Sequence, residues 1–143
     1  MRIFTIGYER ATQDDVVACL KEAGVELLAD IRAVPLSRRP GFSRNILAAG
    51  LREGGIDYVG LKALGTPAEG RDAARKHDLP RLRRIYGGQL ELPEALAQAA
   101  RLIDLAGERP TALLCFERDP ACCHRTLLIE AIMPAAEVID LFP

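Results

Sequence analysis

The stretch TALLCFERDPACCHR, from Thr111 to Arg125, decides the fold prediction for this chain. Its first part, Thr111–Phe116, is a short apolar run that predicts a buried β-strand. The residues that follow, His124–Ile132, predict a helix. A buried strand that leads through a short loop into a helix is typical of α/β proteins with a parallel sheet.

Strand-like and helix-like segments alternate along the rest of the chain. Further strands are predicted at Arg2–Ile6, Glu26–Ile31, Ile56–Val59 and Glu137–Leu141. Helices are predicted after a capping-box pattern at Thr12 and Asp15, from Ser43 to Leu51, around residues 70–85, and from Pro93 to Gly107. This order predicts a single α/β domain over residues 1–143, with a mostly parallel sheet of about four to five strands and helices on both faces.

The overall charge argues against a general polyanion-binding surface. The 143 residues carry a formal net charge of -1. Basic residues nevertheless concentrate in two segments: residues 31–52 contain five arginines and no acidic residue, and residues 71–84 are also mainly basic. Two local basic segments on a nearly neutral protein indicate a focused anion site more than a nucleic-acid-binding face.

Cysteine usage and hydropathy indicate the compartment. There are four cysteines, and their spacing shows no disulfide framework, because the vicinal Cys122 and Cys123 rarely pair with each other. No apolar run approaches the roughly 20 residues needed to span a membrane, and Met1 leads directly into a strand. We therefore expect a cytoplasmic protein with no membrane partner. The oligomeric state is not determined by the sequence.

The strand ends bring the reactive residue types to one edge of the predicted sheet. Gly7 and Tyr8 follow the first strand, Asp30 and Arg32 end the second, and Cys115 to Glu117 end the strand that begins at Thr111. In open parallel sheets, ligand sites form beyond the carboxyl ends of the strands. The sequence therefore predicts a site at this rim.

The cluster Cys123-His124-Arg125 stands where a helix should begin. A thiol at a helix N-terminus beside Arg or a protonated His has a lowered pKa, which favours a reactive thiolate. The same backbone amides and Arg125 could instead hold an oxyanion, and the plain structural alternative is a buried cysteine with paired neighbours. Cys115, Cys122 or Cys123, and His124 could supply three zinc ligands, with Glu117 or His77 as a fourth. A zinc site is nevertheless not expected, because this spacing matches no common zinc module. No metal is therefore predicted.

The segment from Asp30 to Ser43 is a loop with the donors that phosphate recognition needs. Arg32 and Arg38 supply guanidinium groups, and Ser37 supplies a hydroxyl. The alternative is a solvated loop in which Asp30 pairs with Arg32 or Arg125. Gly7 would allow the backbone to approach a ligand closely, and Tyr8 would stack on a ligand or cover the edge of the core. The glycine-rich run of residues 50–55 follows a helix rather than a strand, so no cofactor is expected.

These motifs together resemble the DUF488 family, a group of small proteins of unknown function. The resemblance covers most of the chain and rests on Thr5-Ile6-Gly7, Asp30-Ile31-Arg32 with Pro35, Ser37 and Phe42, Tyr58 before Leu64-Gly65, Leu114 to Glu117, and Cys123-His124-Arg125. The chain departs from the family pattern at Tyr8, where many members have His, and at Thr66, where many have Gly. The resemblance implies a compact α/β fold and a shared set of Asp, Arg, Cys, Glu and His residues at the rim.

The leading functional hypothesis is a site for a small anionic or phosphorylated ligand, with or without thiol chemistry. Arg32, Arg38 and Arg125 would hold the anion, and Cys115 or Cys123 would be the reactive thiol. His124 would transfer protons, oriented by Asp30 or Glu117. The alternative is a nucleic-acid or nucleotide-binding module without catalysis, with phosphate contacts from Arg38, Arg39, Arg44 and Arg81 to Arg84. The sequence does not decide between an enzyme and a binding protein.

Overall fold

Five parallel strands form one sheet with the order β3-β2-β4-β1-β5 in the computed structural model, which describes residues 1–143. The strands are β1 (Arg2–Gly7), β2 (Leu27–Asp30), β3 (Asp57–Gly60), β4 (Thr111–Cys115) and β5 (Glu137–Leu141). The helices are α1 (Gln13–Glu22), α2 (Arg44–Glu53), α3 (Ala68–Arg75), α4 (Leu79–Leu90), α5 (Pro93–Glu108) and α6 (His124–Ile132), with short 3-10 turns η1 (Lys62–Leu64) and η2 (Pro120–Cys122). The predicted parallel α/β sheet is confirmed.

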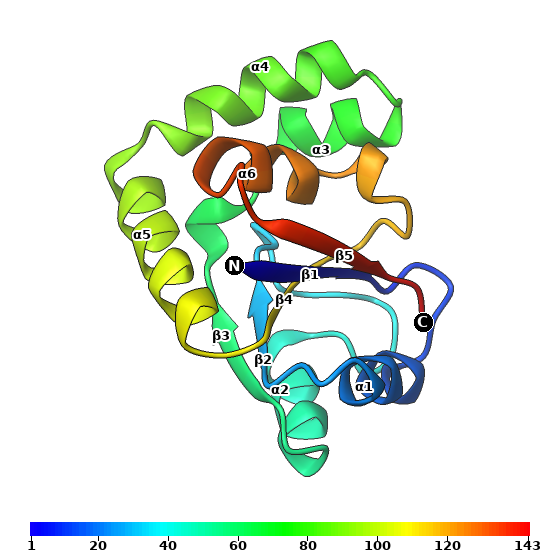
Figure 1. Cartoon of the computed structure of the whole chain (residues 1–143). Helices are drawn as coiled ribbons and strands as arrows, with labels where there is room; N and C mark the ends of the chain where they lie inside the picture. Colours follow the sequence, from blue (N-terminus) through cyan, green and yellow to red (C-terminus); the bar gives the residue numbers. More distant parts are fainter.

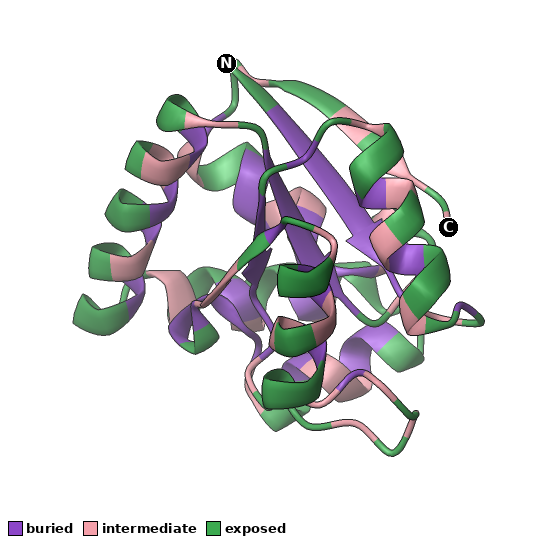
Figure 2. Ribbon diagram, turned by 90° about the horizontal axis from the view of Figure 1, so that it is seen from below, coloured by how far each residue is buried: buried purple, intermediate pink, exposed green.

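Helices cover both faces of the sheet, as Figure 1 shows, with α1 and α2 on one side and α3, α4 and α6 on the other. Successive side chains of a strand point to opposite faces of the sheet, so each strand contributes to two cores. Ile3 faces the core that includes α5 and α6, and its neighbour Phe4 faces the core of α1 and α2. Leu113 and Leu114 of β4 divide in the same way. The central strands are buried on both faces and the helices only on their inner sides (Figure 2), which explains the continuous apolar run of β4.

The connections diverge at the carboxyl end of β4. This strand lies between β2 and β1, whose chains continue into α2 and α1, whereas β4 continues into α6 on the opposite face. Loops that leave neighbouring strands toward opposite faces open a crevice between them. The fold therefore creates a cleft at the rim where the sequence places its polar motifs.

One predicted element is wrong: residues 70–85 do not form a single helix. The chain reverses between α3 and α4, with His77 in the left-handed region at φ 55°. Asp78 then caps α4 by accepting a hydrogen bond from the backbone N–H of Arg81 (3.2 Å), and Pro80 occupies the first turn of that helix. The Asp-Leu-Pro sequence is a helix-start signal that the basic composition of the segment obscured.

The caps of the first helices differ in how they form. Thr12 and Asp15 make the predicted capping box at the start of α1. Ser43 stands at the N-cap of α2, but its hydroxyl donates to the carbonyl of Ser37 instead of capping the helix. Ser43 therefore holds the loop that leads from the rim to α2.

Gly7 makes the closest backbone approach at the rim. A Cβ atom at this position would lie 1.8 Å from the carbonyl oxygen of Glu117, because the end of β1 packs directly against the segment that follows β4. The sequence predicts a close backbone approach of Gly7 to a ligand, whereas the structure shows a close approach to this carbonyl. No side chain fits between the two backbones.

Substitution of this glycine tests the packing of the rim. Gly7→Ala should destabilise the fold by about 1–3 kcal/mol or more, because the added methyl group must displace backbone. The matched control is Gly87→Ala: Gly87 is exposed within α4 and a Cβ there meets nothing within 4 Å, so it should raise stability by roughly 0.5–1 kcal/mol. Urea unfolding of both variants measures the difference. Equal stabilities would contradict the role given to Gly7.

Candidate functional site

A cleft of about 670 Å³ opens at the carboxyl ends of β1, β2 and β4. Its walls come from the loop after β2, from α3 and from the segment after β4. The lining residues are Tyr8, Arg32, Ala33, Val34, Leu36, Arg38, Thr66, Arg71, Ala74, Cys115, Phe116, Glu117 and His124. The cleft therefore gathers Tyr8, Arg32, Arg38, Cys115, Glu117 and His124 from the predicted set.

A buried ion pair between Asp30 and Arg32 forms the base of the cleft. Arg32 donates to the carboxylate through Nε (2.8 Å) and Nη2 (2.7 Å), and both side chains are almost completely buried. Burial opposes the charge of Arg32, but the hydrogen bond and charge of Asp30 outweigh it and raise its pKa above the usual value. The pairing of these two residues, one of the alternatives from the sequence, is therefore what the structure shows.

The rest of the Arg32 guanidinium holds neighbouring segments together. Its Nη1 donates to the carbonyl of Phe42 (2.8 Å) and to the hydroxyl of Tyr8 (3.2 Å). Tyr8 stacks on Phe42 with ring centroids 4.4 Å apart, and Tyr58 donates to Asp30 from β3. Arg32 is thus engaged mainly in joining the ends of β1, β2 and β3, and little of it is free to bind a ligand.

The polar residues of the loop after β2 have different roles: some hydrogen-bond within the chain, and one is free to contact a ligand. Ser37 accepts a hydrogen bond from the backbone of Arg39 (3.1 Å), so its hydroxyl shapes the loop. Arg39 donates to the carbonyls of Tyr8 and Ala11. Arg38, in contrast, is exposed, makes no hydrogen bond or ion pair within the chain, and lines the cleft.

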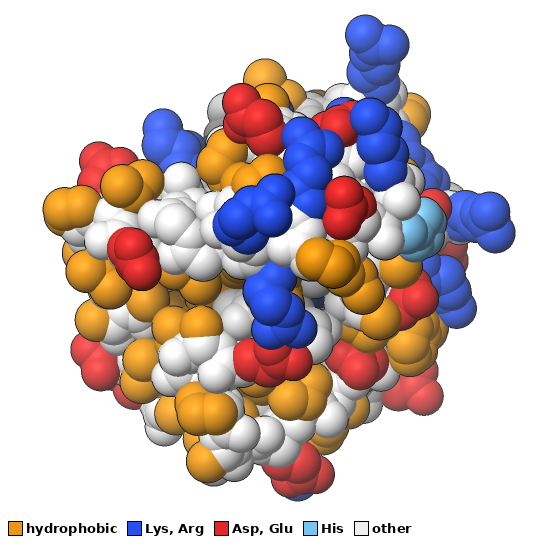
Figure 3. All heavy atoms as spheres, turned by 90° about the horizontal axis from the view of Figure 1, so that it is seen from above, with side chains coloured by type: hydrophobic (Ala, Val, Ile, Leu, Met, Phe, Trp, Pro, Cys, Tyr) orange, Lys and Arg blue, Asp and Glu red, His pale blue; other side chains and the backbone are white.

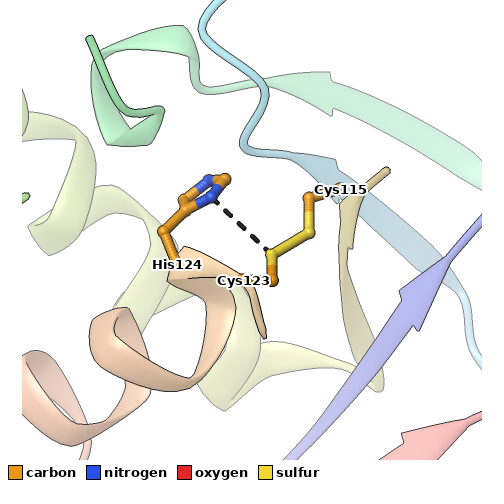
Figure 4. Close-up of side chains that lie close together, drawn as sticks. All are labelled: Cys115, Cys123 and His124. Atoms are coloured by element: carbon orange, nitrogen blue, oxygen red, sulfur yellow. Dashed lines mark hydrogen bonds between the residues drawn. A yellow bond between two sulfur atoms is a disulfide. The ribbon is translucent and has the colours of Figure 1, made fainter. Parts of the chain in front are cut away.

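Cys115 and Cys123 lie against each other at the floor of the cleft and form a disulfide (Figure 4). Cys115 ends β4 and lines the cleft, whereas Cys123 is the N-cap of α6, where its sulfur accepts from the backbone N–H of Arg125 (3.5 Å). The expectation that no cysteines pair is therefore not met. The pairing joins the end of one element to the start of the next, which cysteine spacing alone does not show.

His124 is held in one orientation beside this sulfur pair. Its Nε2 lies 2.8 Å from the carbonyl oxygen of Ile31, and Nδ1 lies 3.7 Å from the sulfur of Cys123. Since a carbonyl can only accept, Nε2 carries the proton and Nδ1 presents its lone pair to the sulfur. Burial lowers the pKa of His124 to about 4, so the ring is neutral near pH 7. The orienting group is thus the Ile31 carbonyl, and neither Asp30 nor Glu117 as predicted.

Glu117 and Arg125 complete the site on the side of β1. A carboxylate oxygen of Glu117 lies 3.4 Å from the sulfur of Cys115, and burial raises the pKa of this carboxyl group. Arg125 is 1% exposed and donates to the Glu117 carbonyl, while burial lowers its pKa to about 10. Arg125 is therefore packed behind the cleft and does not line it, unlike its predicted role as an anion ligand.

Arg71 is among the lining residues that the sequence does not single out for this site, as are the apolar Val34 and Leu36. Arg71 comes from α3, is partly exposed, and donates one hydrogen bond to the carbonyl of Thr66 (3.0 Å). Phe116 is 43% exposed beside Cys115. Arg71 lies in the second basic segment, but only the packing of α3 against the rim distinguishes it from the arginines around it.

The arginines proposed for nucleic-acid contacts do not form one uniform surface. Arg81 pairs with Asp72 and Arg83 with Glu130. Arg44 lies instead in a separate cleft of about 500 Å³ beside the edge strand β3. Lys and Arg side chains do gather on one half of the face above α3 and α4, but acidic side chains lie among them (Figure 3).

The fold and the rim cleft define a small parallel α/β protein whose site combines arginines with a cysteine pair and a histidine. A family model described as a domain of unknown function, DUF488, matches residues 12–132. The chain belongs to this family, which confirms the resemblance seen in its motifs. Neither the curated proteins nor the solved structures compared with the chain gave a match. No helix has both the length and the apolar character for a membrane crossing.

The buried ion pair gives a direct test of the base of the cleft. Asp30→Asn leaves the guanidinium of Arg32 buried without its counter-charge, and the free energy of unfolding should fall by about 3–5 kcal/mol. Urea or thermal unfolding measures the loss.

The matched control is the exposed pair of Arg2 and Glu137, whose side chains are 60% and 65% exposed. Glu137→Gln should change stability by less than about 1 kcal/mol, because water screens an exposed pair. A similar effect of both substitutions would contradict the structural role of the Asp30–Arg32 pair.

Proposed function

We propose that the rim cleft binds a small organic anion, phosphorylated or carboxylated, that also carries an apolar group. The observation that supports this most is the pair of available guanidinium groups, Arg38 and Arg71, on a cleft with an apolar wall. Arginine matches the planar, forked geometry of carboxylates and phosphates better than lysine does. The cleft also has the usual position for ligands on a parallel sheet.

The charges around the cleft favour an anion. Arg32 is neutralised by Asp30, so Arg38 and Arg71 supply the uncompensated positive charge. The acidic group on the lining is Glu117, and burial raises the pKa of its carboxyl group, which favours the uncharged form more than in water. An anion in the cleft therefore meets two cations, with Glu117 as the acidic group on the lining.

The apolar wall indicates the second half of the ligand. Val34, Leu36 and Phe116 line the cleft and are 50%, 70% and 43% exposed. Large apolar side chains gathered at one exposed site are a common feature of binding surfaces. A ligand with an aromatic or aliphatic group beside its anionic group would cover them.

Thiol chemistry on a bound ligand would start at Cys115. This residue lines the cleft with Glu117 beside its sulfur, whereas Cys123 is on the far side of the pair, at the N-terminus of α6. Reaction requires the reduced form, because a disulfide offers no thiolate. Binding of the anion and reactivity of Cys115 are separate properties, and the first does not depend on the second.

Binding of phenyl phosphate tests the proposal, since this probe combines a phosphate with an aromatic ring. Calorimetric titration of the full chain should detect binding, and Arg71→Gln and Arg38→Gln should each weaken it by roughly tenfold or more, because a hydrogen bond to a charged group contributes about 1.5–3 kcal/mol. The control is Arg84→Gln, an exposed arginine of α4 outside the cleft, which should bind as the wild type does.

Salt dependence separates this function from nucleic-acid binding. Phenyl phosphate should bind with a shallow dependence on salt, because one anionic group displaces few ions. An oligonucleotide held by many phosphate contacts loses roughly 10³–10⁵ in affinity between 50 and 200 mM salt. The proposal would be overturned in favour of the nucleic-acid module by two results together. Phenyl phosphate would not bind, and an oligonucleotide would bind with a steep salt dependence and more weakly to Arg84→Gln.

A further inference from the structure

We propose that the reduced protein binds one zinc ion through Cys115, Cys123 and His124, with the fourth coordination position open to the rim cleft. The inference does not depend on the anion site, since neither Arg38 nor Arg71 takes part. It also departs from the expectation of no metal, which rested on spacing along the chain.

The three ligand atoms are already close together. The two sulfurs, which are bonded to each other in the oxidised protein, and one ring nitrogen of His124 all lie within 4.8 Å of one another, and all three side chains are buried. Ligands of a tetrahedral zinc ion lie roughly 3.5–3.8 Å apart, as follows from Zn–S and Zn–N bonds of about 2.3 and 2.0–2.1 Å. The 3.7 Å between His124 Nδ1 and Cys123 Sγ (Figure 4) agrees with this spacing.

The histidine has the tautomer and support that a zinc ligand needs. Its Nε2–H donates to the carbonyl of Ile31, which leaves the lone pair of Nδ1 directed at the sulfur of Cys123. Metal-binding histidines almost always donate their other ring N–H to a carbonyl or carboxylate in this way. Tyr86 packs edge-on against the ring, with centroids 5.2 Å apart, and further limits its rotation.

The surroundings also favour two thiolates and a cation. Cys123 is at the N-terminus of α6 and accepts a hydrogen bond from the Arg125 backbone, which stabilises its thiolate form. Two thiolates, a neutral imidazole and Zn²⁺ have no net charge together, so the complex can be buried beside Arg125. The Cα atoms of the two cysteines are 7.4 Å apart, beyond the roughly 4.4–6.8 Å of most disulfides, which leaves room for an ion between reduced sulfurs.

Two lining residues direct the remaining position to the cleft. Cys115 and His124 both line it, so an ion between them faces the open space. Three protein ligands and one open position are the arrangement of catalytic zinc sites, where water or substrate occupies the fourth position. A closed structural site would need a fourth protein ligand. The nearest carboxylate, Glu117, has an oxygen 3.4 Å from the Cys115 sulfur, but it does not lie within 4.8 Å of all three ligand atoms.

The disulfide and the zinc site are alternative states of the same sulfurs. A dithiol reductant transfers two electrons and two protons to the disulfide, which becomes two thiols while the reductant is oxidised to a disulfide. Zinc then displaces the two thiol protons into solvent and binds the thiolates. Oxidation releases the ion, so zinc occupancy should depend on the redox state.

Competition against a chromogenic chelator measures the site on the full chain. The wild type, reduced and freed of metal, should take up one equivalent of Zn²⁺, and the same protein with its disulfide formed should take up none. Co²⁺ in place of Zn²⁺ should show the thiolate charge-transfer band and the intense visible bands of tetrahedral coordination. These measurements use the wild type alone, so they remain valid even where a substitution disturbs the fold.

Variants identify the ligands. Cys123→Ser and His124→Gln should each weaken zinc binding more than about 100-fold, since loss of an outer-shell partner alone costs roughly 10- to 100-fold. The matched control is Cys122→Ser: this free cysteine is the adjacent residue, and its sulfur lies 3.0 Å from Nδ1 of His77. It should leave affinity unchanged.

Two results would overturn the zinc site. One is a reduced wild type that binds no Zn²⁺ and gives no tetrahedral Co²⁺ spectrum. The other is loss of binding in Cys122→Ser with binding retained in Cys123→Ser, which would place the ion at Cys122 and His77. Anion binding by Arg38 and Arg71, measured without zinc, is unaffected by either result.

Discussion

The buried pair of Asp30 and Arg32 is the interaction on which the rim depends. One guanidinium group joins the end of β2 to Tyr8 after β1 and to the carbonyl of Phe42 in the following loop, while Tyr58 of β3 reaches the same carboxylate. A charge buried this deeply is stable only when its partner stays in place. The pair therefore holds the strand ends at fixed positions, and the cleft forms around them.

The positions of the cysteine sulfurs and the His124 ring also depend on the segment that contains the Asp30–Arg32 pair. His124 is oriented by the carbonyl of Ile31, the residue between Asp30 and Arg32, so the end of β2 fixes the ring that faces the cysteine pair. Gly7 allows β1 to pack against the Glu117 carbonyl, which in turn accepts from Arg125. His124, which lines the cleft, and Arg125, which lies behind it, are thus held by backbone carbonyls, which do not titrate.

Much of the fold could be predicted because its signals are local. The apolar run of β4, the capping box of Thr12 and Asp15 and the alternation of strands with helices each act over a few residues. The prediction of one helix over residues 70–85 is wrong because a turn at His77 interrupts a sequence whose composition is helical throughout. The signal for a new helix, Asp78 followed by Pro80, is present but short.

By itself, the sequence determined that Asp30, Arg32, Cys115, Glu117 and His124 meet at one rim, because parallel strands present their carboxyl ends at the same edge. Only the tertiary structure decided their roles. It engaged Arg32 and Arg125 in internal contacts, brought Arg71 from α3 to the cleft, and placed Cys123 rather than Cys122 beside Cys115. The physical reason is that hydrogen-bond partners and charge neighbours come from segments far apart in the chain, and local sequence carries no record of their distance or direction.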